Sequence, residues 1–503
     1  DPSRLAEFIR RVQLILKDEG VHAGYYAHAS VGLLHVKPVL NLSLAENVER
    51  MRRIADAVSS LTLEFGGAFT GEHGDGIVRS CWIEKMYGTQ IVQAFKEVKM
   101  LFDPHGLMNP HKIVDPWPMT ENLRFAPAVR NEPARTQFDF SAQGGMLGAA
   151  KMCSGVGQCR QRLVGTMCPS YMATADETHT TRARANALRV ALSDKGLLAG
   201  LDDPALTEVM DLCISCKACA SECPTGVDMA RLKAEYLHQR ILTHGASRRA
   251  RWIADFPGKL RQISCIPFVA NHVAQSRWLR AHLERRYGLD RRVTPPMLAG
   301  KTFREWFRRR NARRGHIRDD SLPRVAYLVD TWTNYFTPQV GIAAVTLLEA
   351  AGFHVLCPPT RCCGRPAISQ GLLAEARLAA VYNVELLAPL AYSAVPIVGT
   401  EPSCTLTLTD EYPQLVRSTA ARRVASQTMM LETFLLQVLD SRPELSRSLF
   451  HHSAGNSSGE QFLYHAHCHQ KALVGSGDAV RLMRLAFGDR ATEINSGCCG
   501  MAG

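Results

Sequence analysis

Four cysteines in the run CISCKACASECP have the residue type and spacing of iron–sulfur ligands. Cys213, Cys216 and Cys219 are separated by two residues each, so one short loop can present three thiolates to one cluster. Cys223 precedes Pro224, and a cysteine at this place commonly ligates the other cluster of a two-cluster ferredoxin. A structural zinc site is the alternative, but such sites usually pair two separated CxxC units. The run therefore predicts at least one 4Fe-4S cluster.

Three cysteines upstream, Cys153, Cys159 and Cys168, bring the thiolates of this region to seven, one short of two complete sets of four ligands. In a crossed arrangement, one cluster would take Cys168, Cys213, Cys216 and Cys219, and a second, lacking a cysteine corner, would take Cys153, Cys159 and Cys223. A single cluster, with the remaining cysteines structural, is the open alternative.

Other residues near these motifs are expected to be structural. Three arginines at helical spacing after the first cysteines are expected to cover acidic surface rather than touch a cluster: Arg182, Arg184 and Arg189. Three cysteines without a partner pattern are expected to be ordinary buried thiols: Cys81, Cys265 and Cys357.

Two histidines and an acidic residue near the start of the chain could hold a divalent metal. His28 and His35, with six residues between them, flank one tight turn between two expected strands, which can aim both imidazoles at one point. Glu72 and His73 follow in the glycine-flanked turn GEHGDG, where a backbone can approach a ligand closely. Three such ligands with an open position would form a Lewis-acid site, and the adjacent His73 could act as a base. Strand-end histidines beside an exposed turn are the structural alternative.

A cysteine motif recurs in the C-terminal part of the chain. Each of two stretches carries a Cys-Cys-Gly triplet and one further cysteine, in EPSC and in HAHCHQ. These cysteines are Cys362, Cys363 and Cys404 in the first stretch, and Cys468, Cys498 and Cys499 in the second. Because adjacent cysteines form strained disulfides, the repeat indicates a ligand or redox role. The cysteines could hold a further cluster or zinc, with His467 or His469 as an extra ligand, or shape a quinone or partner site.

Length and composition predict a multidomain protein. With 503 residues, 46% of them hydrophobic, the chain is long enough for about three domains. Its 16 cysteines cluster at metal-type spacings, which indicates a reducing compartment. The sequence has no apolar run of about 18 residues that would span a membrane, and we expect no signal peptide. Asp1 is not an initiator methionine and Gly503 lies in a Gly-rich turn, so both ends are expected to be cuts in a longer protein.

The net charge of +12 is concentrated in one segment. Between Arg248 and Arg314 there are 18 Lys and Arg residues against 4 Asp and Glu residues, a balance of +14. Aromatic residues are interleaved with these charges: Trp252, Phe256, Trp278, Phe303, Trp306 and Phe307. This pattern fits a helical connector whose aromatic residues dock on neighbouring domains. It also fits a surface that binds an anionic membrane. Binding of nucleic acid is not expected.

The hydrophobic periodicity predicts an α+β region first and an α/β region last. In the first region we expect helices at 1–19, 44–63 and 88–103, strands at 22–28 and 31–40, and a third strand that enters the turn at 71–76. In the last region we expect strands at 325–329, 353–356 and 395–399 around helices at 341–352 and 370–392, in the order of a parallel sheet. The expected parts are an α+β domain at 1–115, a linker at 116–145, a helical cysteine-bearing domain at 146–240, a basic connector at 241–320, and an α/β repeat domain at 321–503 with a truncated second half.

Three sets of motifs resemble those of a known family. AHASVGLLH, TGEHGDG and FDPHGLMNPHKIV look like the C-terminal catalytic half of the FAD-linked oxidases of the vanillyl-alcohol-oxidase type, in the subgroup of D-lactate, glycolate and D-2-hydroxyglutarate dehydrogenases. The cysteine run and the CCG motifs resemble the fused iron–sulfur version of these enzymes. This resemblance covers nearly the whole chain. It implies an FAD-linked oxidase C-terminal (cap) α+β domain, a helical 4Fe-4S ferredoxin-like domain and an α/β CCG domain similar to that of heterodisulfide reductases.

The resemblance also implies roles for residues of the first domain. His28, His35 and Glu72 would ligate a divalent metal such as zinc or manganese, which would hold the 2-hydroxyl and carboxylate of the substrate. His73 would be the general base that takes the hydroxyl proton while hydride passes to flavin N5. Asn109 would lie near the flavin.

Two further residues are candidates for substrate binding, Lys37 and Arg79. Related enzymes often have a small polar residue at the position of Lys37. A lysine there could pair with a second carboxylate, which favours a dicarboxylate such as D-2-hydroxyglutarate, or it could simply face solvent.

The flavin-binding domain of this family would precede these residues. GEHGDG is not a dinucleotide-binding fingerprint, because its glycines do not open a helix after a strand. FAD is therefore expected to be bound mainly by a domain outside this chain.

The expected function is an FAD-dependent D-2-hydroxy-acid dehydrogenase that passes electrons through one or two 4Fe-4S clusters to a quinone or electron carrier. The alternative is a non-catalytic iron–sulfur electron-transfer subunit of a larger complex. The expected location is cytoplasmic. Peripheral contact with the inner face of the membrane and a homo-oligomer are left open.

Overall fold

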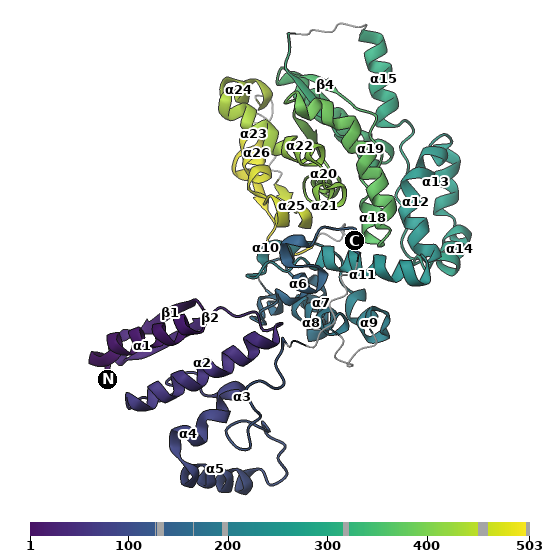
Figure 1. Ribbon diagram of the computed structural model, residues 1–503. Helices are drawn as coiled ribbons and strands as arrows, with labels where there is room; N and C mark the ends of the chain where they lie inside the picture. The colour runs from purple at the N-terminus through teal and green to yellow at the C-terminus, as the bar shows by residue number, and fades with distance from the viewer. Residues whose placement is uncertain are drawn as a thin grey trace. The chain divides into compact units, whose positions relative to one another are not determined.

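The computed structural model of the chain describes residues 1–125, 127, 135–163, 165–193, 200–314, 321–450 and 461–498. The chain divides into two compact units, Asp1–Arg130 and Asn131–Gly503 (Figure 1). Helices and small sheets alternate in the first unit and at the end of the second, so the predicted mixture of α+β and α/β domains is confirmed.

The first unit contains one β-hairpin and five helices among its described residues. In chain order they are α1 (Leu5–Asp18), β1 (Ala23–His28), β2 (Leu33–Pro38), α2 (Ala45–Glu64), α3 (Gly76–Arg79), α4 (Ile83–Tyr87) and α5 (Thr89–Phe102). The predicted helices at 1–19, 44–63 and 88–103 and both predicted hairpin strands are confirmed.

The core of this unit forms between the hairpin and the two long helices α1 and α2. Val12 and Leu16 of α1 and Ile54 and Leu61 of α2 are buried together. One face of the hairpin packs on them, through side chains that include Val36. Because successive strand residues point to opposite faces, this packing leaves the other face of the hairpin for polar side chains.

The predicted third strand before the GEHGDG turn was wrong. Residues 65–75 form turns and bends. Among the residues of this unit that the structure describes, β1 and β2 form a two-stranded sheet and pair only with each other. An extended segment here would have no strand to accept its backbone hydrogen bonds, so the chain folds as a loop instead.

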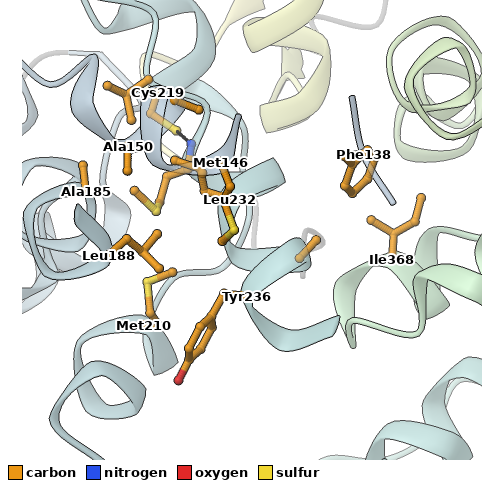
Figure 2. Close-up of a cluster of buried hydrophobic side chains, with 14 of the residues drawn as sticks. Phe138, Met146, Ala150, Ala185, Leu188, Met210, Cys219, Leu232, Tyr236 and Ile368 are labelled. Atoms are coloured by element: carbon orange, nitrogen blue, oxygen red, sulfur yellow. Dashed lines mark hydrogen bonds between the residues drawn. The ribbon is translucent and has the colours of Figure 1, made fainter. Parts of the chain in front are cut away.

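The second unit begins with short helices that surround the cysteine loops. In order they are α6 (Met146–Lys151), α7 (Pro169–Thr174), α8 (Thr181–Ala191), α9 (Pro204–Asp211), α10 (Ala218–Glu222) and α11 (Met229–His244). Figure 2 shows their shared apolar core, in which Cys219 lies beside Met146 and Ala150. The same core includes Phe138 and Phe140, from the segment where the sequence predicts a linker. Buried Glu235 holds that segment by accepting hydrogen bonds from the backbone N–H groups of Gln137 and Phe138, both at 3.1 Å.

The basic stretch is helical. It forms α12 (Arg248–Ile263), α13 (Pro267–Gln275), α14 (Arg277–Tyr287) and α15 (Phe303–Arg314). Phe303 of α15 is fully buried in the core of the following α/β region, and Trp306 and Phe307 pack against that core.

The α/β region is built on a parallel four-stranded sheet in the order β4-β3-β5-β6. The strands are β3 (Arg324–Tyr327), β4 (His354–Leu356), β5 (Ile397–Gly399) and β6 (Thr428–Met430). The helices are α16 (Thr331–Tyr335), α17 (Pro338–Ala350), α18 (Arg365–Ser369), α19 (Leu373–Tyr392), α20 (Pro402–Thr409), α21 (Glu411–Val416), α22 (Thr419–Gln427), α23 (Leu431–Ser441) and α24 (Glu444–Phe450). The predicted parallel order of the first three strands is confirmed, and β6 is an addition that the sequence analysis missed.

The second half of the repeat is smaller. It comprises β7 (Phe462–Tyr464), α25 (Cys468–Leu473), α26 (Gly477–Phe487) and β8 (Ala491–Glu493), with β7 and β8 paired in parallel as a separate sheet. No helix in the described parts of either unit is long and apolar enough to cross a membrane.

Candidate metal and iron–sulfur sites

The register of the hairpin brings the predicted metal ligands to one face. Tyr26 pairs with His35, His28 with Leu33, and Gly24 with Lys37. Directly opposed residues of an antiparallel pair share a face, as do residues two apart on one strand. His28, His35 and Lys37 therefore lie on the same face of the hairpin, opposite the face that packs on α1 and α2.

The GEHGDG loop adds a carboxylate to these histidines. Glu72 Oε2 lies 3.6 Å from His28 Nε2 and 3.3 Å from His35 Nε2. One ligand atom from each of the three residues lies within 4.8 Å of the others, so the three can face one ion. Two imidazole nitrogens and one carboxylate oxygen fit a divalent metal such as zinc and leave a position open for substrate. The predicted trio is brought together.

Close packing positions this loop over the hairpin. A Cβ on Gly71 would lie 2.8 Å from Leu33 Cδ1, so the loop lies close against β2 at this glycine and a larger residue would displace the Leu33 side chain. Thr70 donates to Asp75 Oδ1 at 2.6 Å, and Arg79 Nη2 donates to the Gly74 carbonyl at 2.7 Å. The structure thus gives Arg79, predicted as a substrate ligand, a contact that supports the loop.

The structure places the other predicted residues of this unit, His73, Lys37 and Asn109, in different surroundings. His73 Nε2 lies 3.7 Å from Glu72 Oε2, and its ring centre is 5.6 Å from that of His35. Lys37 shares the hairpin face, with its Nζ 4.6 Å from the centre of the Tyr26 ring. Asn109 lies in a separate exposed turn, where its Oδ1 accepts a hydrogen bond from Lys112 at 3.1 Å. His73 therefore lies beside Glu72, and Lys37 lies two residues from His35 on the same face of the hairpin.

The cysteines of the second unit line two small cavities. One is lined by Cys168, Cys213, Cys216 and Cys219. The other is lined by Cys153, Cys159 and Cys223. This grouping is the one that the crossed arrangement predicts. Thiolate sulfurs in sets of four and three, grouped around enclosed spaces, fit iron–sulfur clusters.

Buried hydrogen bonds orient the sulfurs of the four-cysteine cavity. Cys168 Sγ accepts from Thr181 N at 3.0 Å, and Cys219 Sγ accepts from Met229 N at 3.3 Å. Ser215 and Lys217 have φ values of +53° and +64°, an alternation typical of concave anion-binding loops. Burial raises the pKa of Cys216 to about 12, so a thiolate there needs a positive counter-charge such as iron.

In the three-cysteine cavity, Cys223 is only partly buried. Burial opposes ionisation of Cys223, but hydrogen bonds from Thr225, Val227 and Gly226 outweigh it and lower its pKa. A thiolate is thus easier to form here than at Cys216.

Glu222 ties the two cysteine loops together. Its carboxylate accepts from Thr166 N at 2.8 Å and from Met167 N at 2.9 Å, just before Cys168. A Cβ on Gly165 would lie 2.5 Å from Glu222 Oε2, so this contact requires glycine. Glu222, which precedes Cys223 in the chain, therefore links that cysteine to the segment just before Cys168.

The prediction that the arginines stay away from the cysteine sites was wrong for Arg184 and Arg182, which both line a cysteine cavity. Arg184 is 2% exposed, lines the four-cysteine cavity and donates to the Val209 carbonyl at 3.0 Å. Arg182 lines the three-cysteine cavity, donates to the Gly155 carbonyl at 3.2 Å and also pairs with Glu177. Both reach the cavities because α8 packs its first turns against the two cysteine loops. The spacing of the arginines along the helix could not predict this packing.

The lone cysteines also differ from prediction. Cys265 is exposed rather than buried, because it follows the end of α12. Cys81 and Cys357 are partly buried, and burial raises the pKa of Cys357 to about 12.

The cysteines of the first CCG motif form a compact buried group. Cys363 is in hydrogen-bonding contact with both Cys362 and Cys404. Contact with Cys363 and burial hold the pKa of Cys362 well above its ordinary value. The structure therefore brings the three predicted residues of this half together.

The second CCG half lies against the four-cysteine loop. Cys468 is fully buried in the apolar core that contains Cys216, and Cys498 packs against the same core. His469 Nε2 lies 3.0 Å from the Ser215 carbonyl. His467 Nε2 is buried without a hydrogen-bond partner among the described residues, and burial lowers the pKa of His467 to about 4. The neutral imidazole of His467 is thus the better metal-ligand candidate of the two. Cys499 lies outside the described residues.

A buried network of charges joins the cysteine loop to the first CCG motif. Lys217, between Cys216 and Cys219, is 3% exposed and pairs with both Asp410 and Glu411. Glu411 also pairs with Arg365, two residues after Cys363. Buried charges persist only when they are paired. This network therefore fixes the cysteine loop and the first CCG motif relative to each other. The sequence analysis missed Lys217, Arg365 and Glu411, since no local motif marks them.

Comparisons with known families agree with this sequence of modules. Residues 1–113 match the C-terminal domain of FAD linked oxidases, residues 149–227 the 4Fe-4S dicluster domain, and residues 328–409 the cysteine-rich domain called CCG. The chain therefore carries an FAD-linked oxidase C-terminal domain followed by iron–sulfur and cysteine-rich domains, and the predicted family resemblance is confirmed.

Similar curated proteins include D-2-hydroxyglutarate dehydrogenases. Those of Escherichia coli (strain K12) and Pseudomonas putida (strain KT2440) are 25% identical over 545 residues and 27% identical over 556 residues. Both alignments cover 100% of this chain and 52% of the relative, so the chain spans about half the length of these relatives. A subunit of the anaerobic glycerol-3-phosphate dehydrogenase of Escherichia coli (strain K12) is 27% identical over 237 residues, 47% of this chain and 57% of that protein. No solved structure matches the chain.

The histidine trio should bind a divalent metal in this chain alone. We expect zinc or manganese, measured by elemental analysis after incubation and gel filtration, to be retained by the wild type and mostly lost by His35→Ala and Glu72→Gln, because each removes one of three ligands. His22→Ala, which removes an exposed histidine just before β1, is the matched control and should retain the metal. Equal metal content in all four proteins would contradict the site.

The two cysteine cavities should hold different clusters. We expect Cys216→Ser and Cys223→Ser each to lose about half of the iron, since each removes a ligand from only one of two clusters. Their electron paramagnetic resonance spectra should lose different signals. Cys265→Ser, at an exposed cysteine outside both cavities, should keep the full iron content. Loss of the same signal in both cavity variants would show that the cysteines serve one cluster.

Proposed function

We propose that this chain is the metal- and cluster-bearing part of an FAD-dependent D-2-hydroxy-acid dehydrogenase. The observation that carries the proposal is the convergence of His28, His35 and Glu72 on one face of the hairpin, with His73 beside them. FAD would be held mainly by a domain outside these residues. Electrons would leave through the iron–sulfur sites towards a quinone or electron carrier.

The trio would bind the reacting end of the substrate. A divalent metal held there would polarise the 2-hydroxyl group and draw the adjacent carboxylate to the open position. His73 would take the hydroxyl proton at Nε2, the nitrogen that lies 3.7 Å from Glu72 Oε2. Hydride would then pass from the substrate carbon to the flavin, and the product would be a 2-oxo acid.

Lys37 would bind the far end of a dicarboxylate. It lies on the same face as the two histidines, and its Nζ stacks over Tyr26 rather than pairing with a described carboxylate. An ammonium group in this place complements a second carboxylate. This favours D-2-hydroxyglutarate over D-lactate, in keeping with the names of the relatives that cover the whole chain.

A second candidate function is an iron–sulfur subunit that transfers electrons without a catalytic site of its own. The similarity of about half of the chain to a subunit of an anaerobic glycerol-3-phosphate dehydrogenase favours it. The histidine trio favours the dehydrogenase, because a docking domain would not need three metal ligands and a base on one face.

Flavin reduction in the FAD-containing protein separates the two functions. We expect D-2-hydroxyglutarate to reduce the flavin of the wild type in stopped-flow absorbance measurements. His73→Ala should lower the rate at least ~100-fold, because general-base catalysis contributes about that much or more. Lys37→Met should raise the KM for D-2-hydroxyglutarate and leave that for D-lactate unchanged, because only the dicarboxylate reaches the lysine.

His22→Ala is the control and should reduce its flavin at the wild-type rate, and all variants should retain their FAD. A wild-type rate in His73→Ala would remove the assignment of His73 as the base. No reduction of the wild type by any D-2-hydroxy acid would favour the electron-transfer subunit.

A further inference from the structure

Helices α12, α13 and α14 form a basic extension of the second unit (teal in Figure 1). Helix α12 is anchored, since Ala250 and Leu260 are buried and the helix contacts α18. Helix α13 is also held in place, because the Asn271 side chain accepts from Leu298 N at 2.7 Å and donates to the Leu298 carbonyl at 2.9 Å. These helices are therefore fixed parts of the fold.

Although they are fixed, α13 and α14 have no buried residue. Their exposed side chains include Phe268 of α13 at 82% and Trp278 of α14 at 71% exposure, and Val269, Val273 and the preceding Ile266 are also exposed. Val269 and Val273 are four residues apart on α13 and so share one face of the helix, and Ile266 is the residue just before it. A connector would turn such a face towards protein, as α15 does with Phe303, so this face points to a ligand of its own.

Positive charge is concentrated in the same helices as these apolar side chains. Between Arg248 and Arg292 there are 11 Lys and Arg residues against Asp255, Glu284 and Asp290, a balance of +8. Two of these acids are already paired, Glu284 with Arg291 and Asp290 with Arg292. Arg277, Arg285 and Arg286 of α14 are exposed. The charge thus complements an anionic surface.

We propose that α13 and α14 bind the surface of a bilayer that contains anionic lipids. Phe268, Ile266 and Val269 would enter the boundary between headgroups and acyl chains, with Trp278 at the interface, and the arginines would contact lipid phosphates. Nucleic acid would match the charge but offers no apolar layer for the aliphatic side chains. The binding is peripheral and is independent of whether the chain oxidises a hydroxy acid.

Vesicle flotation tests this surface. We expect the wild-type chain to float with vesicles of phosphatidylcholine and phosphatidylglycerol in equal amounts, but not with vesicles of phosphatidylcholine alone. Rising ionic strength should weaken the binding, because salt screens the charge attraction. The double variant Phe268→Ser/Trp278→Ser and the triple variant Arg277→Glu/Arg285→Glu/Arg286→Glu should each bind at least ~10-fold more weakly.

The matched control carries Leu378→Ser and Arg422→Glu, an exposed leucine and an exposed arginine on α19 and α22, and should bind like the wild type. Circular dichroism should show that all variants fold. The proposal is overturned by equal binding to both kinds of vesicle, by no binding to either, or by wild-type binding of the apolar and charge variants. It is also overturned if the same substitutions abolish dimerisation or binding of an acidic protein while the chain does not bind lipid.

Discussion

The buried pairing of Lys217 with Asp410 and Glu411 is the interaction on which the second unit depends. Lys217 belongs to the cysteine loop, and Glu411 reaches Arg365 beside the first CCG motif. Removing one partner of a buried pair typically costs about 3–5 kcal/mol, because the remaining charge stays buried without compensation. This network, together with the contact of His469 with the Ser215 carbonyl, makes the iron–sulfur loop and the CCG region one structural body.

In the first unit, the side chains of the β-hairpin alternate between a face that packs on the core and a face that carries polar residues. One face of β1 and β2 supplies Val36 to the core, and the other presents His28, His35 and Lys37. The approach of Gly71 to Leu33 then brings Glu72 over the same face. Polar ligands are thus held on a hairpin whose stability comes from its opposite side, so the site needs little burial of its own.

Sequence patterns predicted the features whose residues lie close together in the chain. Cysteine spacing placed Cys213, Cys216 and Cys219 on one loop, and strand periodicity predicted the hairpin and the parallel sheet, because ligands on one loop and residues on one strand are close in sequence. Long-range contacts were missed. Arg184 enters a cysteine cavity and Phe138 enters the core only through the packing of distant helices. The third strand was wrongly predicted because Phe69 and Thr70 are typical strand residues but have no strand to pair with.

We propose that substrate oxidation at the histidine face feeds electrons to the cysteine cavities. Freeze-quench electron paramagnetic resonance of the FAD-containing protein, mixed anaerobically with D-2-hydroxyglutarate, tests it most directly. We expect signals of reduced iron–sulfur clusters to appear within the turnover time, as the flavin passes on its electrons. A flavin that becomes fully reduced while the clusters stay oxidised would contradict this transfer of electrons from flavin to clusters.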